Sequence, residues 1–259
     1  EKIKDLSKKT VISQWFEDHL ADTGPDFASN RKKLLKYDNF VTSNFITTHP
    51  STLDFLRKKK NFHYLPIPVD KNIEKLKIYE NNNQINDVFF SMSHGVNRGK
   101  LKRDKQDERH NFITDLITEC PNIIFDIYGY NNREPVWAED FYKVIVNSKM
   151  ALNLTRGKPL KYLTSNRIAS LIGNGLLTFI DKRTQLSNFF NGNEVIFYSG
   201  LEDLANKINF YKSNDKKRIN VAKKGRRKYF DLFECQKVAN YIILKSFNRE
   251  ISKKLKWMD

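Results

Sequence analysis

The chain has 259 residues, of which 39% are hydrophobic and 13% aromatic, so it can bury the core of one large or two small domains and is not a disordered protein. It carries 46 lysines and arginines against 30 aspartates and glutamates, a net charge of +16. This charge suits acidic partners such as nucleic acid, anionic lipid headgroups or phosphorylated small molecules, although a generally lysine-rich surface would give the same total.

Cysteine usage and hydropathy exclude further classes of protein. Cys120 and Cys235 stand in apolar helical contexts without the spacing of metal ligands, which favours a reducing compartment over a disulfide framework or a metal site. No run approaches the roughly twenty apolar residues of a membrane span. We therefore expect a cytoplasmic protein. The sequence shows neither a signal peptide nor an initiator methionine, so we also expect a fragment or a processed product.

The first 70 residues alternate short apolar runs with short helical ones. The predicted elements are a strand at 10–16, a loop at 21–30, a basic helix at 31–36, a strand-like run at 38–45, a helix at 49–60 and a strand at 62–70. Such alternation indicates a parallel sheet. Only about two strand–helix steps fit before residue 70, too few for a complete doubly wound domain. We therefore expect a partial α/β domain whose beginning is absent.

Residues 71–86 are rich in Lys, Glu and Asn and predict a linker. After it come strands at 87–93, 122–130, 150–154, 176–180 and 194–198, with helices at 105–119, 140–146, 164–173, 186–190 and 201–211. Two basic helices, at 216–232 and 235–254, complete the chain. Strands interleaved with helices in this way predict a Rossmann-like parallel sheet with helices on both faces over residues 87–245, followed by a basic tail at 246–259.

Loops after the strands are the candidate ligand-binding segments, because the carboxyl ends of parallel strands meet at one rim of a sheet. They are residues 95–102, 128–131 and 155–167. In the first loop, two glycines allow the backbone to approach a diphosphate, and Arg98 could hold it through two hydrogen bonds. This loop matches neither a Walker motif nor a GxGxxG motif, so a basic surface turn is the alternative. Before the helix at 164–173, free backbone N–H groups beside Arg167 predict an anion site, unless that helix serves packing alone.

Four stretches together carry a resemblance to a known family. They are the run from Arg167 to Gly175 with the apolar strand up to Asp181, the run 192–198, the helix 201–208 and the run 222–226. Residues from about 88 to 245 resemble the C-terminal, donor-binding domain of a GT-B glycosyltransferase, of the family 1/4 type seen in CgeB-like and lipopolysaccharide-modifying proteins. Residues 1–70 resemble the end of the N-terminal, acceptor-side domain.

The resemblance implies a glycosyltransferase that moves a sugar from a nucleoside-diphosphate sugar to a glycan, lipid or protein acceptor, without a metal or another cofactor. It implies that Arg98 and a following lysine, Lys102 or its competitor Lys100, hold the donor diphosphate, and that Ser165, Asn166 and Arg167 lie near the phosphates. It also implies that the base lies near Tyr128, Gly129 and Tyr130, with Ser170 at the ribose position. Gly95 and Arg156 in the loops are further candidates for phosphate contacts. Fixed cations beside a diphosphate leaving group would stabilise the charge that grows in the transition state. The family usually has a glutamate at the position of Ser170 to hold the ribose, and a serine suits a 2′,3′-diol less well.

The acceptor-side base is predicted at the end of the first strand, where Glu17, Asp18 and His19 follow one another. One of them would deprotonate the acceptor hydroxyl if the enzyme inverts configuration. If it retains configuration, the same side chain would only stabilise charge. A solvated strand end without a catalytic role is the alternative.

Two other functions stay open at this point. With Tyr128, Tyr130 and Trp137 near basic loops, the chain could bind single-stranded nucleic acid. No RRM, OB-fold or helix-turn-helix pattern supports this, and we expect no nucleic-acid partner. A glycosyltransferase-like scaffold without activity would fit Ser170. The expected partners are a nucleotide-sugar donor and a glycan or lipid-linked acceptor, and the basic residues 253–257 could add peripheral contact with an anionic membrane.

Overall fold

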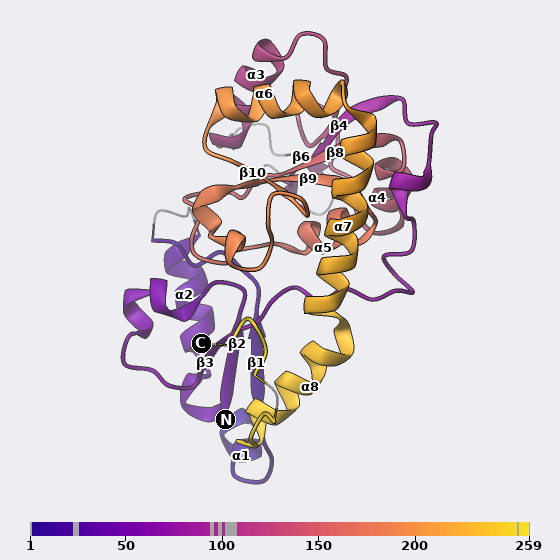
Figure 1. Cartoon of the computed structure of the whole chain (residues 1–259). Helices are drawn as coiled ribbons and strands as arrows, with labels where there is room; N and C mark the ends of the chain where they lie inside the picture. The colour runs from indigo at the N-terminus through magenta and orange to yellow at the C-terminus, as the bar shows by residue number, and fades with distance from the viewer. Residues whose placement is uncertain are drawn as a thin grey trace.

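Two parallel β-sheets, one above the other in Figure 1, organise the chain. The computed structural model describes residues 2–22, 26–93, 96–97, 100–101, 108–252 and 254–258, with the backbone alone at 96–97 and 100–101. Within these residues, the smaller sheet has three strands and the larger sheet has five. A short antiparallel pair, β5 (Val96–Asn97) and β6 (Lys100–Leu101), follows the first strand of the larger sheet.

The smaller sheet pairs β1 (Ser13–Phe16), β2 (Ser43–Ile46) and β3 (Phe62–Tyr64) in parallel. Helix α1 (Lys2–Ser7) precedes it, and its connections contain helix α2 (Phe27–Leu35) and the 3-10 turns η1 (Asp38–Phe40), η2 (Pro50–Thr52) and η3 (Asp54–Leu56). Leu34 of α2 and Leu56 of η3 are buried in one core cluster with Ile46 of the central strand. The helices therefore anchor the sheet through apolar side chains.

Two helices predicted in this region differ in the structure. The helix expected at 31–36 begins already at Phe27, whose ring packs on Phe55 with centroids 5.9 Å apart. The helix expected at 49–60 consists of the turns η2 and η3. Leu53 between them is extended (φ −113°, ψ 97°), and this break in the helix lets both Leu53 and Leu56 reach the core.

The larger sheet confirms the predicted Rossmann-like architecture. From one edge to the other, its strands are β10 (Ile196–Tyr198), β9 (Leu177–Asp181), β8 (Ser148–Asn153), β4 (Asn86–Ser91) and β7 (Phe125–Tyr128). Each neighbouring pair is parallel. Numbered by their order in the chain and read from β7, the strands run 2-1-3-4-5, so the strand order reverses between β4 and β8.

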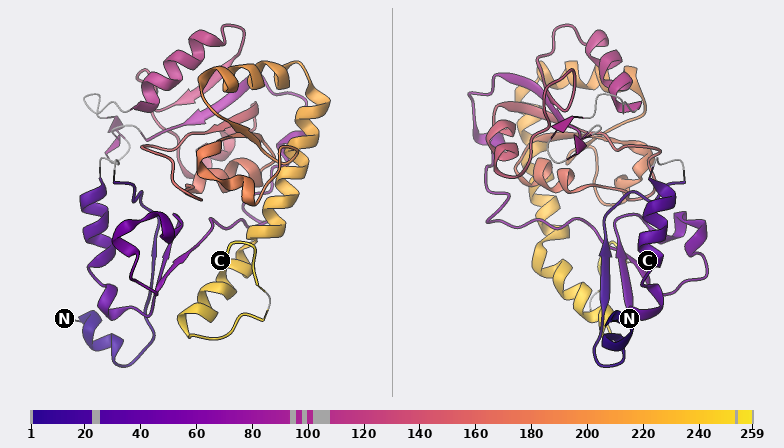
Figure 2. Two further views of the ribbon diagram at one scale, coloured as in Figure 1. Left: turned by 60° about the vertical axis from the view of Figure 1, so that its left-hand side comes forward. Right: turned by 180° about the vertical axis from the view of Figure 1, so that it is seen from behind.

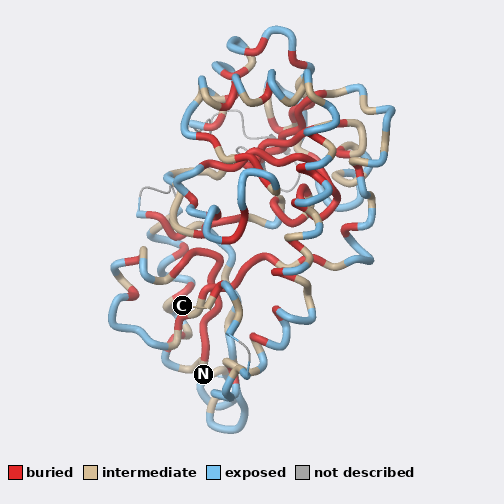
Figure 3. The backbone as a smooth tube through the Cα atoms, viewed as in Figure 1, coloured by how far each residue is buried: buried red, intermediate tan, exposed pale blue. Residues whose placement is uncertain are grey.

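Helices cover both faces of this sheet, because β4 is buried along almost its whole length and its successive side chains point to opposite faces. Val88 and Phe90 share a core cluster with α3 (Glu108–Glu119) and α6 (Leu201–Lys212). Phe89 shares a different cluster with α4 (Ala138–Ile145) and α5 (Asn166–Gly173). Figure 1 shows α3 and α6 above the sheet and α5 below it, and Figure 3 shows the strands between them as a buried layer.

The predicted linker, residues 71–86, packs closely against the helices of the larger sheet. Ile78 in the turn η4 (Ile78–Glu80) is buried, and its N–H donates to the Asn174 carbonyl at 2.7 Å. The Leu76 N–H donates to Oδ1 of the same asparagine at 3.1 Å. These bonds fix the segment beside the end of α5. The predicted domain ranges themselves stay a prediction.

The last two helices connect the two sheets. α7 (Asp215–Phe233) packs along α5, and α8 (Cys235–Ser246) lies beside the smaller sheet, as Figure 2 shows. The ring of Tyr241 in α8 meets that of Phe45 in β2 with centroids 5.9 Å apart. The Ser13 hydroxyl of β1 donates to the Ser246 hydroxyl at 2.6 Å. The turns η5 (Lys182–Thr184) and η6 (Leu186–Asn188) follow β9.

The helix predicted at 235–254 is shorter in the structure. It ends at Ser246, and Asn248 just beyond it takes the left-handed conformation that commonly ends a helix (φ 51°). Trp257 in the tail is only 3% exposed and packs in the protein core. Lys254 and Lys256 beside it are exposed, so the indole ring is the part of this tail that is withdrawn from the surface. In the described ranges, no helix has the length and apolar character needed to cross a bilayer.

Candidate functional site

A crevice opens where the strand order reverses, at the carboxyl ends of β4 and β8. Residues 91–93 at the end of β4 and residues 155–156 after β8 form its floor, and the first turns of α3 and α5 stand beside it. A cavity of about 520 Å³ occupies this crevice, a volume typical of small-molecule sites. We call it the switch-point cavity. Residues from both sheets line it, and those that the sequence analysis singled out are Glu17, Asp18, His19, Arg156, Ser165, Asn166, Arg167 and Ser170.

Arg167 fastens the two sides of the crevice together. Its guanidinium donates to the Ser91 carbonyl at 2.6 Å and to the Leu154 carbonyl at 2.7 Å, at the ends of β4 and β8. Burial, and then the nearby charge of Arg109, lower the pKa of Arg167 to about 9, which still leaves the group charged at neutral pH. A buried positive charge thus stands at the point of strand reversal. Its predicted contact with a phosphate stays a prediction.

Two buried polar atoms beside the start of α5, Oγ of Ser165 and Nε of Arg167, have no hydrogen-bond partner among the described residues. Ser165 stands at the N-cap of α5, yet its side chain makes no capping bond. A buried polar atom without a partner costs free energy, so this group of atoms indicates a ligand that completes the hydrogen bonds. An anion would suit Ser165 and Arg167, since both stand at the N-terminus of a helix.

Glu17, Asp18 and His19 follow β1 and reach the cavity from the smaller sheet. Glu17 accepts a hydrogen bond from Nδ2 of Asn166 at 2.8 Å, which joins the smaller sheet to the start of α5. Nδ1 of His19 accepts from the Ala21 N–H at 3.2 Å, so the neutral ring carries its proton on Nε2. Burial lowers the pKa of His19 and favours this neutral form. His19 is therefore suited to donate a hydrogen bond, whereas the exposed carboxylate of Asp18 can accept a proton.

Ser170 lines the cavity beside Tyr142, with the two hydroxyl oxygens 3.5 Å apart. The Tyr142 hydroxyl also donates to the buried carboxylate of Glu74 at 3.4 Å. Burial raises the pKa of Glu74. A carboxyl group therefore supports this wall of the cavity, but it comes from the segment before β4 and acts through a tyrosine hydroxyl.

Three residues predicted for the base and ribose lie away from the cavity. Tyr128 stacks under the guanidinium of Arg133, 3.7 Å from the ring centroid, and Tyr130 packs on α3. Gly129 has a φ of 76°, and a Cβ there would stand 1.9 Å from the Met92 carbonyl oxygen. Only a glycine permits this close approach of two loops. The structure thus gives these three residues packing contacts.

The remaining predicted phosphate contacts are only partly described. Gly95, Arg98 and Lys102 lie outside the described residues, as does the side chain of Lys100. Their roles stay predictions. Arg156 reaches the cavity and forms an ion pair with Asp26 at 3.4 Å.

The structure adds residues that the sequence analysis missed. Arg109, in the first turn of α3, is 6% exposed and lines the cavity near Arg167. Tyr142 lines it from α4, and Trp137 before α4 exposes 53% of its surface there. Trp137 was considered only as a nucleic-acid contact, although a large aromatic residue between a strand and a helix is also a typical small-molecule contact. The sequence gives no indication that Arg109 is buried in a site, because a single basic residue in a polar first turn of a helix is usually exposed to solvent.

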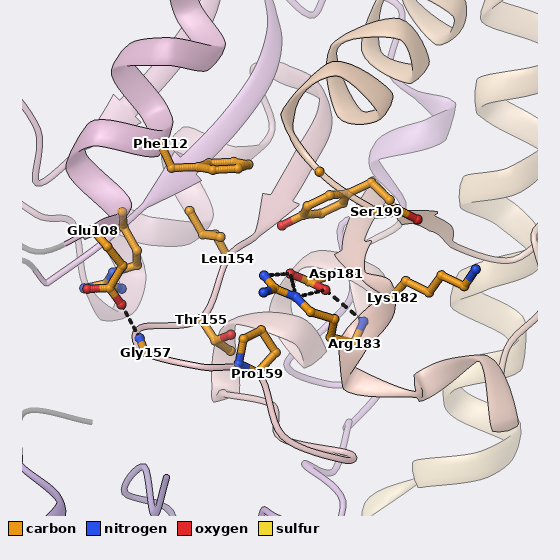
Figure 4. Close-up of a pocket in the computed structure, with 13 residues that line it drawn as sticks. Glu108, Phe112, Leu154, Thr155, Gly157, Pro159, Asp181, Lys182, Arg183 and Ser199 are labelled. Atoms are coloured by element: carbon orange, nitrogen blue, oxygen red, sulfur yellow. Dashed lines mark hydrogen bonds and ion pairs between the residues drawn. The ribbon is translucent and has the colours of Figure 1, made fainter. Parts of the chain in front are cut away.

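A second cavity of about 590 Å³ adjoins the first and shares Arg109 and Thr155 with it. It lies at the carboxyl ends of β9 and β10, and we call it the β9–β10 cavity; Figure 4 shows its lining. Asp181 accepts hydrogen bonds from Nε and Nη2 of Arg183, the shortest 2.6 Å long. Glu108 accepts one from the Gly157 N–H. In the described part of the chain, no group of three or more His, Cys, Asp or Glu residues is arranged to hold a metal ion.

Comparison with solved structures places the fold among glycosyltransferases. HepE from Anabaena, in complex with UDP and glucose, superposes with a TM-score of 0.63 at 14% identity, over 92% of this chain and 72% of that chain. A variant of S. aureus TarM, in complex with Fondaparinux, alpha-GlcNAc-glycerol and UDP, gives a TM-score of 0.60 at 12% identity, over 92% of this chain and 51% of that one. Sucrose-phosphate synthase from Thermosynechococcus elongatus gives 0.59 at 11% identity, over 94% of this chain and 69% of that chain.

Sequence comparison identifies the family. No protein of curated function matches the chain significantly. The profile of the family described as glycosyl transferase-like matches residues 105–243, more than half of the chain. These residues span α3 to α8 and hold the carboxyl ends of β8, β9 and β10. The chain therefore belongs to the glycosyl transferase-like family and has a GT-B fold.

Proposed function

We propose that this protein transfers a sugar from a nucleoside-diphosphate sugar to a hydroxyl group of a glycan or lipid-linked acceptor. The observation that carries the proposal is the switch-point cavity, whose lining brings buried arginines and the unsatisfied Ser165 hydroxyl together with Asp18 and His19 from the loop after β1. One wall offers an anion site and the other offers groups that exchange protons. Transfer of a sugar from a diphosphate to an acceptor hydroxyl uses an anion site for the leaving diphosphate and a group that takes up the hydroxyl proton.

The diphosphate of the donor would lie against Arg109, Ser165 and Arg167. Both arginines are buried, and the charge of Arg109 is close enough to lower the pKa of Arg167. With the N-terminus of α5, they would stabilise the negative charge that grows on the leaving diphosphate. A metal ion supplies this stabilisation in other enzymes, and fixed cations here support a metal-independent reaction.

The nucleoside would extend from the diphosphate toward α4. Trp137 offers an exposed ring for the base, and Ser170 and Tyr142 offer hydroxyl groups for the ribose, with Glu74 behind the tyrosine. Residues 128–130, which the resemblance implies for the base, do not line this cavity. Uracil is the first base to test, because the HepE and TarM structures contain UDP.

We assign proton acceptance to Asp18 in an inverting reaction. The acceptor oxygen would bond to the anomeric carbon of the donor sugar, the bond from that carbon to the diphosphate oxygen would break, and the acceptor proton would pass to Asp18. The Nε2–H of His19 would donate to an oxygen of the sugar or the acceptor. Asp18→Asn should therefore lower turnover strongly while leaving UDP affinity unchanged.

Calorimetric titration with UDP, UMP and uridine tests the donor site. We expect UDP to bind more tightly than uridine, and Ser165→Ala to weaken UDP about fivefold without changing uridine affinity, because one hydrogen bond to a phosphate is lost. Ser7→Ala, on the exposed helix α1, is the matched control and should change neither affinity.

Three results would contradict the proposal in different ways. A protein that binds no nucleoside diphosphate lacks the donor site. One that binds UDP but neither hydrolyses nor transfers any of a panel of UDP-sugars, GDP-sugars and ADP-sugars is the inactive scaffold. One that binds an oligonucleotide more tightly than any mononucleotide is a nucleic-acid-binding protein.

A further inference from the structure

The β9–β10 cavity has no role in the donor site proposed above. Its volume of about 590 Å³ lies in the range of small-molecule sites. It opens on the side of the sheet that carries α3 and α6, whereas the proposed nucleoside site lies toward α4 and α5. A ligand could therefore occupy it while a nucleotide is bound.

Tyr198 at the end of β10 gives this cavity an unsatisfied hydroxyl. The residue is 1% exposed, lines the cavity, and its oxygen has no hydrogen-bond partner among the described residues. Burial, and then the charge of Asp181, raise the pKa of Tyr198, so the hydroxyl keeps its proton. A phenylalanine would avoid the cost of this buried polar atom. A ligand oxygen that pairs with the hydroxyl would account for the tyrosine.

The walls combine an apolar side with a polar one. Figure 4 shows Phe112 and Leu154 on one side and the hydrogen-bonded pair of Asp181 and Arg183 across from them. The Phe112 and Tyr198 rings lie 6.4 Å apart at 32°. A sugar ring has the matching form, since its C–H groups pack on aromatic and apolar side chains while its hydroxyls donate to carboxylates and accept from guanidinium and hydroxyl groups.

The charges in the cavity argue against other ligand classes. The lining sets two carboxylates, Asp181 and Glu108, against three basic residues, Arg109, Lys182 and Arg183. Arg183 is paired with Asp181, so the cavity lacks the strong excess of cations that a polyphosphate chain needs. A lipid chain would need a continuous apolar surface. The Asp181–Arg183 pair and Glu108 interrupt the apolar surface of this cavity. A neutral ligand with many hydroxyl groups meets neither obstacle.

We propose that the β9–β10 cavity binds a sugar ring of a glycan acceptor. That this sugar belongs to the acceptor rests on the proposed function, and the position of the cavity supports it. Arg109 and Thr155 line both cavities, so a ring held against Phe112 and Tyr198 reaches toward the diphosphate end of the donor site. The larger sheet would thus bind part of the acceptor as well as the donor.

Ligand-observed NMR with simple glycosides tests the proposal. The probes are the methyl α- and β-glycosides of glucose, galactose, mannose and N-acetylglucosamine, titrated into the protein with saturating UDP. We expect at least one to bind saturably. Tyr198→Phe should weaken that glycoside about five- to tenfold and leave UDP affinity, measured by calorimetry, unchanged. It should also raise the Tm of the ligand-free protein, because an unpaired buried hydroxyl is removed.

Tyr229→Phe is the matched control. Tyr229 is equally buried, but its hydroxyl donates to the Ile67 carbonyl at 2.9 Å, so the variant should have a lower Tm and an unchanged glycoside affinity. The proposal is overturned if no glycoside binds to UDP-loaded protein, or if neither Tyr198→Phe nor Phe112→Ala changes the affinity. Displacement of the glycoside by a UDP-sugar but not by UDP would assign the cavity to the donor sugar instead. Failure to bind UDP would count against the proposed function alone.

Discussion

Replacing Arg167 tests whether one guanidinium holds the crevice between β4 and β8 together. Arg167→Ala removes the bonds of 2.6 and 2.7 Å to the Ser91 and Leu154 carbonyls. Each hydrogen bond from a charged donor contributes about 1.5–3 kcal/mol, and the cost of burying the charge offsets part of the sum. We therefore expect the free energy of unfolding to fall by about 2–4 kcal/mol, a large share of the roughly 5–15 kcal/mol of a typical domain.

Urea unfolding followed by circular dichroism measures this loss. Arg167→Lys should recover less than half of it, because one ammonium group cannot span two carbonyls as a planar guanidinium does. Arg57→Ala is the control, since Arg57 is 75% exposed in its ion pair with Asp54 and should cost less than about 1 kcal/mol. UDP affinity should also fall in the Arg167 variants. An Arg167→Ala protein as stable as the parent would refute the role we give to these two bonds.

Three further predictions concern the stability of the protein at acid pH, the binding of the donor diphosphate and the binding of the nucleotide base. Burial, and then the charge of Lys245, lower the pKa of His63 from 6.5 to about 4. The unfolded chain therefore binds the proton first, and stability should fall by about 1–2 kcal/mol as the pH drops from 6.5 to 4, because solvent screens part of the shift at this half-buried imidazole. His63→Gln should remove this loss from unfolding curves measured across the same range. Arg98→Ala should weaken nucleoside-diphosphate binding about ten- to hundredfold in calorimetry without affecting the bare nucleoside, and Arg98→Lys should recover only part; unchanged binding would place the phosphates elsewhere. Trp137→Ala should weaken uridine and UDP by a similar factor of about ten, and a loss confined to UDP would contradict base stacking.

The larger sheet was predictable because each of its strands is buried on both faces. The run Val88–Phe90 is apolar without interruption, the run Leu177–Ile180 is apolar except for the buried Thr178, and helical segments with one apolar face separate such runs. The parallel arrangement then follows from the length of the connections. The smaller sheet was less predictable. The run 49–60 has helical composition, yet an extended Leu53 divides it, because two leucines must enter the same core.

The candidate site was predictable only where its residues follow strands. Ser165 to Arg167 and Glu17 to His19 could be placed because carboxyl ends of parallel strands share a rim. Arg109 and Tyr142 could not, since their position depends on how α3 and α4 pack. Tyr128 and Tyr130 stand at a strand end too, but contacts with Arg133 and α3 direct their rings elsewhere.

The serine at position 170 shows why a departure from a family pattern must be interpreted in three dimensions. Taken alone, Ser170 in place of a glutamate suggests a weakened ribose site. In the structure, the carboxyl group of Glu74 reaches the same wall through Tyr142, and Gly173 makes room for it, since a Cβ at that position would stand 2.6 Å from Cγ of Glu74. Under the proposed function, hydroxyl groups of Ser170 and Tyr142 would meet the ribose with the carboxyl group of Glu74 behind them.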